Sequence, residues 1–317
     1  MEQSLSKVRS MKEVTAEAVS YIAGRRDHNI VSLKTRWAKF NKQCMGGIEP
    51  NTVYTIAGIS GSGKSSIVNS LTTDLIDLNP TEDIVILNFS LEMVGFRQVG
   101  RTLSNKLRKT TSALYSSETS LDDESFRKVI AVSNQLKEYP IYFVDDPGTP
   151  MQVDKIIRDF YDEYIKGTGK HFIITYDHTL LTKQIGSVIE TTSELERVFI
   201  QAKKLPMTSV IQIAQMNRNI ESPERINNPS SHYPMRSDLS SSDAMFQASD
   251  YVLVMHRPEI LNIQEYGPNR LPTKNKVYMH MLKNRDAGKP CILEFENDLM
   301  YNNLIETLCF GQVLTLK

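Results

Sequence analysis

One short stretch limits the fold of this 317-residue chain more than any other. It reads YTIAGISGSGKSSIVNS, from Tyr54 to Ser70, and within it residues 58–65 fit the pattern G-x-x-x-x-G-K-[S/T]. An apolar run typical of a strand precedes the pattern, and a stretch with helical character follows it. In that setting glycines let backbone N–H groups turn towards phosphates, and the helix N-terminus adds partial positive charge. The stretch therefore predicts a P-loop nucleotide-binding fold.

The same loop predicts roles for single residues. We expect Lys64 to neutralise β- and γ-phosphate oxygens and the Ser65 hydroxyl to hold Mg²⁺. The alternative, a chance Gly/Ser loop, is disfavoured by the strand before it and the helix after it. The expected nucleotide-binding residues of the loop are Gly58, Ser60, Gly61, Ser62, Gly63, Lys64, Ser65 and Ser66.

Apolar runs alternate with helical stretches from residue 52 onward. This pattern predicts an α/β fold with a mainly parallel, twisted sheet and helices on both faces. The last two apolar runs are close together and predict a hairpin added to that sheet, whereas the polar stretch 218–240 is expected to be a long, functional surface loop. We expect strands at 53–57, 84–89, 141–144, 172–176, 209–214, 251–256, 276–283 and 291–296, and helices at 65–77, 94–108, 122–138, 151–166, 190–204 and 242–248.

Residues 11–26 show helical periodicity, with Val14, Ala18 and Ile22 on one apolar face. We therefore expect an N-terminal helix region over 1–30, ahead of a main domain over 31–317. The apolar face either packs on its own domain or docks on a neighbouring subunit, and the sequence leaves both open.

Composition restricts the classes of partner. Lys+Arg and Asp+Glu both number 37, so nucleic-acid binding would need a local basic patch. The three cysteines, Cys44, Cys291 and Cys309, match no metal-binding spacing and are expected to be reduced thiols. No apolar run approaches the ~20 residues that cross a membrane. We expect a cytoplasmic protein without a membrane partner.

Three polar residues stand at the ends of predicted strands. Asp177 ends FIITYD and is expected to support the metal; the alternative is a carboxylate that caps the strand exit. Glu92 follows IVILNFS and is expected to polarise the attacking water, with an ordinary surface Glu as the alternative. Gln215 ends SVIQIAQ and is expected to sense the γ-phosphate, although a turn-forming Gln would look the same.

Together with the P-loop, four further pieces occur in the order found in DnaB-type replicative helicases. They are NFSLEM (88–93), AQMNR (214–218), SDLSSSDAMFQASDYVLVMHR (237–257) and LKNRDAGKP (282–290). The chain resembles that family over roughly residues 11–300, and residues 11–26 resemble the family's linker helix. The resemblance implies a RecA-like core that assembles into a ring, usually a hexamer, and binds ATP between subunits. It also implies single-stranded DNA as substrate, with a primase and a helicase loader as further partners.

The resemblance implies roles for matching residues. Glu92 is the implied catalytic base, Asp177 the metal-linked carboxylate, Arg101 a nucleotide contact and Gln215 the γ-phosphate sensor. Lys283 and Arg285 match a pair that reaches into the neighbouring subunit's site, with Arg285 as arginine finger. Without the resemblance this pair would be read as solvated charges at a strand end.

The DNA-contacting segment departs from the family pattern. Residues 240–243 read Ser-Ser-Ser-Asp where the family has R-E-S-G, so an Arg and a Gly are lost. Four basic residues are candidates for channel charge, with ordinary surface charge as the alternative: Lys203 and Lys204, and Arg218 and Arg225 in the loop after Gln215. We expect no N-terminal collar domain ahead of the helix at 11–26, which would resemble compact, phage-encoded members of the family. The predicted DNA contacts are Arg218, Ser240, Ser241, Ser242 and Asp243.

Three functions from different classes fit these observations. The first is a ring-forming, ATP-dependent DNA helicase. The second is a RecA-like filament or regulatory DNA-dependent ATPase without unwinding, and the third is a nucleotide-binding scaffold without turnover. The combination of Lys64, Glu92, Asp177 and Arg285 disfavours the scaffold, and the segment at 282–290 favours a ring over a filament.

Overall fold

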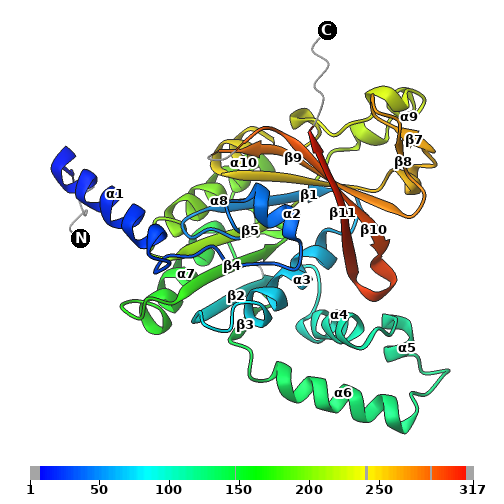
Figure 1. The fold of residues 1–317 in the computed structure, drawn as a ribbon, viewed down its shortest axis with the longest axis horizontal. Helices are drawn as coiled ribbons and strands as arrows, with labels where there is room; N and C mark the ends of the chain where they lie inside the picture. The colour runs from blue at the N-terminus through cyan, green and yellow to red at the C-terminus, as the bar shows by residue number, and fades with distance from the viewer. Residues whose placement is uncertain (1–7, 147, 240–241, 286–287, 312–317) are drawn as a thin grey trace. The chain divides into compact units, whose positions relative to one another are not determined.

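The computed structural model describes residues 8–146, 148–239, 242–285 and 288–311 (Figure 1). The chain forms two compact units, and the division falls between Ser32 and Leu33. Whether these units correspond to a linker region and an ATPase domain stays a prediction.

The first unit contains helix α1 (Met11–Arg26), which has the bounds expected from the sequence. Ser10 is its N-cap and forms a capping box with Glu13, which satisfies backbone N–H groups at the start of the helix. Two arginines in the last turn complement the negative end of the helix dipole. Several apolar side chains of α1 are exposed, namely Met11, Val14, Val19 and Ile22.

The second unit is built on one nine-stranded sheet with the order β11-β10-β9-β6-β1-β5-β4-β2-β3. The six strands from β6 to β3 are parallel, and β9, β10 and β11 add to them in antiparallel fashion. A separate small sheet pairs β7 (Glu265–Tyr266) with β8 (Leu271–Pro272). The strands of the large sheet are β1 (Val53–Gly58), β2 (Ile84–Ser90), β3 (Ile141–Val144), β4 (His171–Asp177), β5 (Thr208–Gln215), β6 (Tyr251–His256), β9 (Lys276–Asn284), β10 (Cys291–Asp298) and β11 (Asn303–Gly311).

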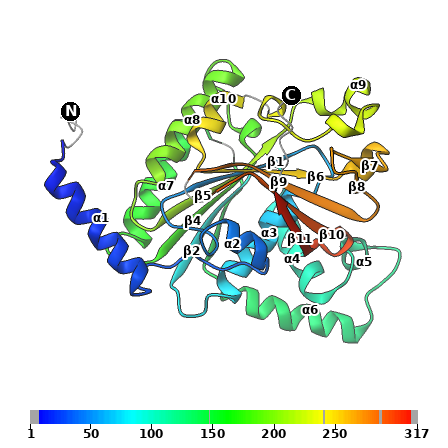
Figure 2. The same ribbon diagram turned by 45° about the horizontal axis from the view of Figure 1, so that its top comes forward.

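Helices cover both faces of this sheet (Figure 2). Alternate strand residues point to opposite sides, so Ile84 and Ile86 pack with α2 (Ala38–Gln43) and α3 (Lys64–Asp77). Val85 and Leu87 pack instead with α7 (Pro150–Tyr164) and α8 (Val188–Ala202). Further elements are α4 (Gly95–Leu107), α5 (Thr111–Tyr115), α6 (Asp123–Leu136), α9 (Pro223–Ile226), α10 (Ser242–Ala248) and the 3-10 turns η1 (Thr179–Leu181), η2 (Arg218–Glu221), η3 (Pro229–Ser231), η4 (Arg236–Asp238), η5 (Pro258–Leu261) and η6 (Leu299–Tyr301).

The structure confirms the eight expected strands and six expected main-domain helices, with bounds that agree within two residues. The expected C-terminal hairpin is confirmed, since β9 and β10 pair in antiparallel fashion and β9 joins the sheet at β6. A further strand, β11, pairs with β10 and was not expected, because its residues are mostly half-exposed and lack a clear apolar pattern. One prediction was wrong in detail. The stretch 218–240 is not a plain surface loop, since it folds into short helical turns whose Ile220, His232 and Leu239 are buried. No helix among the described residues is long and apolar enough to span a membrane.

Candidate nucleotide-binding site

The predicted P-loop connects β1 to α3, and its glycines are required by geometry. Gly61 and Gly63 have φ values of 75° and 98°, in the left-handed region that favours glycine. A Cβ on Gly58 would lie 2.4 Å from Ser62 Oγ and 2.6 Å from the Met255 carbonyl oxygen. The loop therefore closes around its own backbone and would be filled by any side chain at Gly58.

Lys64 opens α3 and lies inside the loop. Its ammonium donates to the Ile59 carbonyl at 2.8 Å, and the Ser62 hydroxyl donates to the same oxygen at 2.8 Å. Burial lowers the pKa of Lys64, while the carboxyls of Asp177 and Glu92 act in the opposite direction. A cation at the N-terminus of a helix, inside a glycine-rich loop, fits the phosphates of a nucleotide.

Two other serines of the loop region have different surroundings. Ser60 is exposed at the loop tip. The Ser66 hydroxyl donates to Asn302 Oδ1 at 3.5 Å, so in this chain its partner belongs to the connection between η6 and β11.

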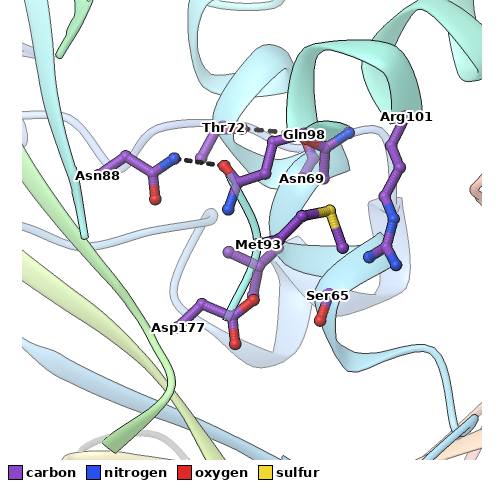
Figure 3. Close-up of a pocket in the computed structure, with 9 residues that line it drawn as sticks. Ser65, Asn69, Thr72, Asn88, Met93, Gln98, Arg101 and Asp177 are labelled. Atoms are coloured by element: carbon purple, nitrogen blue, oxygen red, sulfur yellow. Dashed lines mark hydrogen bonds between the residues drawn. The ribbon is translucent and has the colours of Figure 1, made fainter. Parts of the chain in front are cut away.

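Asp177 ends β4, and its side chain points into the same pocket as Ser65 and Arg101 (Figure 3). Burial, followed by the charge of Glu92, raises the pKa of Asp177 to about 6, against the opposing effects of Ser65, Lys64 and Arg101. Its Oδ1 is buried and has no hydrogen-bond partner among the residues that the structure describes. An unpartnered carboxylate oxygen beside a serine hydroxyl fits a divalent cation, which prefers oxygen ligands.

Glu92 lies between β2 and α4, and its side chain is mostly exposed. Its Oε2 lies 3.9 Å from Nε2 of His178, the residue after Asp177. Burial lowers the pKa of Arg101 on α4, and Asp177 and Glu92 oppose this shift. The structure therefore brings together four predicted residues from separate elements, Lys64, Glu92, Arg101 and Asp177.

A hydrogen-bonded chain that the sequence did not reveal supports the Glu92 segment. Asn88 Nδ2 donates to Gln98 Oε1 at 2.6 Å (Figure 3), and Gln98 Nε2 donates to the Ser90 hydroxyl at 2.8 Å. That hydroxyl in turn donates to the Met93 carbonyl. The chain ties both ends of the segment 90–93 to β2 and α4, and so restricts where Glu92 can lie. No sequence signal could have identified it, because Asn88 and Gln98 meet only through the fold.

Gln215 ends β5 beside the P-loop. In the parallel register it is the partner of Gly58, and its side chain is exposed. Arg218 begins η2, a few residues further on, and is also exposed. Gln215 and Arg218 are therefore both accessible on the side of the sheet where the parallel strands end and the P-loop lies.

Lys283 and Arg285 lie near the N-terminal ends of the parallel strands, whereas the P-loop lies at their C-terminal ends. Asn284 is the register partner of Tyr251, at the start of β6, whereas Met255, near the end of β6, is the partner of Gly58. On the order of 13 Å of strand separates the two pairs. Lys283 and Arg285 are thus not brought to the P-loop of their own chain.

The predicted DNA segment is described in part. Ser240 and Ser241 lie outside the described residues, and Ser242 is the first residue of α10. Asp243 is 75% exposed and forms an ion pair with Arg236 at 2.8 Å, which offsets its negative charge.

The expectation of channel charge is wrong for two of the four basic residues. Lys203 forms an ion pair with Asp250 at 2.7 Å, and Arg225 forms one with Asp238 at 2.5 Å. Both cations are largely buried, because each satisfies a buried carboxylate, so neither charge is free. Lys204 is exposed.

A P-loop between a central parallel strand and a helix, with acidic residues at neighbouring strand ends, defines a P-loop NTPase with a RecA-like core. The chain belongs to the DnaB-like helicase C terminal domain family, whose model matches residues 32–301.

Curated relatives are replicative DNA helicases named DnaB. The protein from Pasteurella multocida is 23% identical over 256 residues, which cover 79% of this chain and 52% of the relative. The protein from Buchnera aphidicola subsp. Schizaphis graminum is 26% identical over 236 residues, which cover 73% of this chain and 47% of the relative. The chain thus spans about half the length of the curated relatives it matches.

Two solved structures share the fold. One is described as an ATPase domain and superimposes with a TM-score of 0.77 at 18% identity, over 95% of this chain and 100% of that domain. A DnaB-like replicative helicase, described together with its interactions with primase, gives a TM-score of 0.73 at 18% identity, over 95% of this chain and 67% of that one.

Proposed function

We propose that the chain is a subunit of a ring-forming, ATP-dependent replicative DNA helicase that translocates on single-stranded DNA and unwinds duplex at the fork. One observation carries most of this proposal. The P-loop, Glu92 and Asp177 lie at the C-terminal ends of the parallel strands. Lys283 and Arg285 lie near the opposite, N-terminal ends. If Arg285 contributes to hydrolysis, it acts on the P-loop of a second copy, as in a ring.

The proposed nucleotide is ATP with Mg²⁺. The phosphates would be held by the loop from Gly58 to Ser66 and by Lys64, and Arg101 would contact the same nucleotide. The Ser65 hydroxyl and the unpartnered Oδ1 of Asp177 fit the divalent cation. When bound, the cation would neutralise charge on the β- and γ-phosphates.

Hydrolysis needs a residue that orients water and accepts its proton. We assign this role to Glu92, since its side chain is exposed near Lys64 and Asp177, and the chain from Asn88 to Met93 restricts its segment. Gln215, beside Gly58, would detect the γ-phosphate and pass its loss to the segment from Arg218 onward. Arg285 of the next subunit would stabilise transition-state charge, with Lys283 beside it.

The proposed partners are single-stranded DNA, further copies of the chain in a hexameric ring, a primase and a helicase loader. The proposed DNA contacts are Arg218 and the segment Ser240, Ser241, Ser242 and Asp243. Such contacts address the phosphate backbone, so DNA binding should be salt-sensitive and tolerant of sequence. The proposed location is the cytoplasm, that of the host if the chain is phage-encoded.

A second candidate is a filament-forming or regulatory DNA-dependent ATPase without unwinding activity. Its supporting observation is Asp243, an exposed carboxylate in the segment proposed to hold DNA phosphates. Electron microscopy with a non-hydrolysable ATP analogue separates the two candidates. Closed six-membered rings favour the helicase, and extended filaments favour the alternative.

The direct test is strand displacement on forked DNA that carries a 5′ or a 3′ tail, with Lys64→Ala protein as control. We expect the wild-type chain to displace one strand in an ATP-dependent reaction on one of the two forks, and the variant to displace none. DNA-stimulated ATP turnover without displacement on either fork would contradict unwinding and favour the second candidate.

A further inference from the structure

The carboxylate of Asp250 joins three segments that are distant in the chain. Asp250 precedes β6 and is almost completely buried. It accepts hydrogen bonds from the Val53 N–H at 2.8 Å and from Lys203 Nζ at 2.7 and 2.8 Å. Its third partner is the Arg285 guanidinium, whose Nη1 lies 2.8 Å from Oδ1. The Arg285 N–H also donates to the Asp250 carbonyl at 3.0 Å, which fixes the start of that side chain.

The two cations that share Asp250 differ in exposure. The Lys203 side chain is 16% exposed and the Arg285 side chain 46%, against 3% for Asp250. The Arg285 side chain also donates to the Gln247 carbonyl at 3.2 Å, near the end of α10. Lys203 is thus a buried partner, and Arg285 is a partner at the surface.

This difference in exposure determines the energetic cost of moving the Arg285 side chain away from Asp250. A buried carboxylate without a partner is strongly unfavourable, so losing its only cation would be costly. Asp250 would keep both Lys203 and the Val53 N–H, so the departure of Arg285 leaves no buried charge unpaired. Lys203 therefore makes the ion pair of Arg285 exchangeable.

Lys283, the other basic residue of the pair, is held by α10 and not by Asp250. Lys283 Nζ donates to the Phe246 carbonyl at 2.5 Å and lies 5.1 Å from the centre of the Phe246 ring. It therefore sits on α10 and does not replace Lys203 as a partner of Asp250. Arg285 is the side chain of this pair that can leave a carboxylate.

We propose that Asp250 is a resting site for Arg285, and that Lys203 is the positioning residue that keeps this site weak enough to release it. The inference rests on the proposed function, in which Arg285 acts on the nucleotide of the neighbouring subunit. In a subunit without a neighbour, Arg285 pairs with Asp250. In the ring, it exchanges one anion, the carboxylate, for another, the phosphate bound by the next chain.

Replacement of Lys203 tests this account in assembled rings of the protein. In Lys203→Met, Arg285 is the one cation of the described part of the chain that still forms an ion pair with Asp250, so it should be held more firmly. We expect kcat for DNA-stimulated ATP hydrolysis to fall by roughly tenfold, with KM for ATP unchanged because the P-loop is untouched. Lys203→Arg should keep kcat near the wild-type value. Lys166→Met, at an exposed position just after α7, is the control and should change neither constant.

The double variant Lys203→Met/Asp250→Asn gives the decisive readout. Without the carboxylate there is nothing to retain Arg285, so kcat should return towards wild type. A structural role for Lys203 predicts the opposite, a double variant worse than either single one, and that result would overturn the inference. Wild-type kcat in Lys203→Met would overturn it as well.

Two further measurements keep the test interpretable. If Lys203→Met does not fold, Asp250→Asn alone is informative: kcat at or above wild type supports the inference, and a loss as large as in Arg285→Ala overturns it. Arg285→Ala distinguishes an error in the proposed function from an error in the resting-site proposal. If kcat of Arg285→Ala equals wild type, Arg285 does not act as an arginine finger, and this part of the proposed function is wrong. If Arg285→Ala loses turnover while Lys203→Met does not, only the resting site is wrong.

Discussion

Nε2 of His178 lies 3.9 Å from Oε2 of Glu92, so the residues that follow β4 and β2 face each other beside the P-loop. Burial lowers the pKa of His178, and the nearby charge of Lys64 adds to this effect while Glu92 opposes it. The imidazole is therefore neutral at pH 7 and does not cancel the charge of Glu92. A carboxylate that keeps its charge can act on water, which is the role proposed for it.

The first prediction concerns that carboxylate. Glu92→Gln keeps the shape of the side chain and removes its basicity, so we expect ATP turnover to fall by roughly 100-fold or more. Nucleotide affinity should stay close to wild type, because Lys64 and the loop are unchanged. Steady-state hydrolysis and equilibrium binding of a fluorescent nucleotide measure the two quantities. Glu118→Gln, at an exposed position between α5 and α6, is the control. Turnover near wild type in Glu92→Gln would remove Glu92 from the mechanism.

The second prediction separates stability from function at Asp177. Its pKa is about 6 in the folded chain, against an ordinary value of 3.8, so the folded state binds more protons between these two pH values. The group therefore destabilises the nucleotide-free fold at neutral pH, and this penalty is relieved as the pH falls from about 6 to about 4. Asp177→Asn should raise the free energy of unfolding at pH 7.5, by at most about 3 kcal/mol, and abolish Mg²⁺-dependent turnover.

Denaturant unfolding at pH 7.5 and pH 4.5 checks this prediction. The gain in stability should be largest at pH 7.5 and shrink at pH 4.5. Asp83→Asn, an exposed residue ahead of β2, should show no such gain. A variant less stable than wild type at pH 7.5 would mean that Asp177 is a structural partner in the nucleotide-free chain.

The third prediction concerns three buried histidines: His232, within the stretch 218–240, and His256 and His280, on strands β6 and β9. His280 Nε2 and the Tyr266 hydroxyl are 2.6 Å apart, and His232 Nδ1 lies 3.2 Å from His256 Nε2. Burial lowers the pKa of His280 to about 3. Between about pH 6.5 and pH 3 the unfolded chain binds a proton that the folded chain does not, so stability falls as the pH drops through this range.

His280→Gln keeps a hydrogen-bonding partner for Tyr266 and removes the titration. We expect its unfolding free energy to depend less on pH between 6 and 4, by up to about 1.4 kcal/mol per pH unit. The slope is the readout, because the substitution also changes the absolute stability. His28→Gln, at an exposed position, should keep the wild-type slope. Equal slopes in wild type and His280→Gln would show that His280 titrates normally.

The fourth prediction concerns α1. Its exposed Met11, Val14 and Ile22 are available to a neighbouring subunit, so deletion of residues 1–26 should weaken ring formation. Sedimentation velocity over a range of protein concentrations measures this, with Glu17→Gln on the same helix as control. A sedimentation profile that the deletion leaves unaltered would favour the alternative, in which α1 packs on its own domain.

The fold was largely predictable because strong local signals coincide with it. The P-loop lies between a strand and a helix, and the buried strands of a parallel sheet are continuous apolar runs. Elements with weaker signals were missed: α2 and α5 are short, and β11 lies at a sheet edge and is mostly half-exposed. The turns within 218–240 were missed because their buried residues follow neither helical nor strand periodicity.

The site was predictable only in part. Lys64 begins α3, Asp177 ends β4 and Glu92 closely follows β2, so each is tied to an element that the sequence makes visible, and the parallel order of the strands places them together. Asp250 was not recognised, since its partners Val53, Lys203 and Arg285 lie on three other elements and only the folded chain brings them together. The buried ion pairs of Lys203 and Arg225 were missed for the same reason.

The central claim is that each ATPase site combines the P-loop of one subunit with Arg285 of the next, and a mixing experiment tests it most directly. Lys64→Ala removes the proposed phosphate-binding cation, and Arg285→Ala removes the proposed finger; the contribution of such a finger to turnover is typically about 10³-fold or more. Each variant alone should be nearly inactive. In mixed rings, the intact P-loop of an Arg285→Ala subunit meets the intact Arg285 of a Lys64→Ala subunit, so ATP turnover should reappear and be greatest near equal proportions. Mixed assemblies, verified by sedimentation, that remain as inactive as either variant alone would contradict the claim.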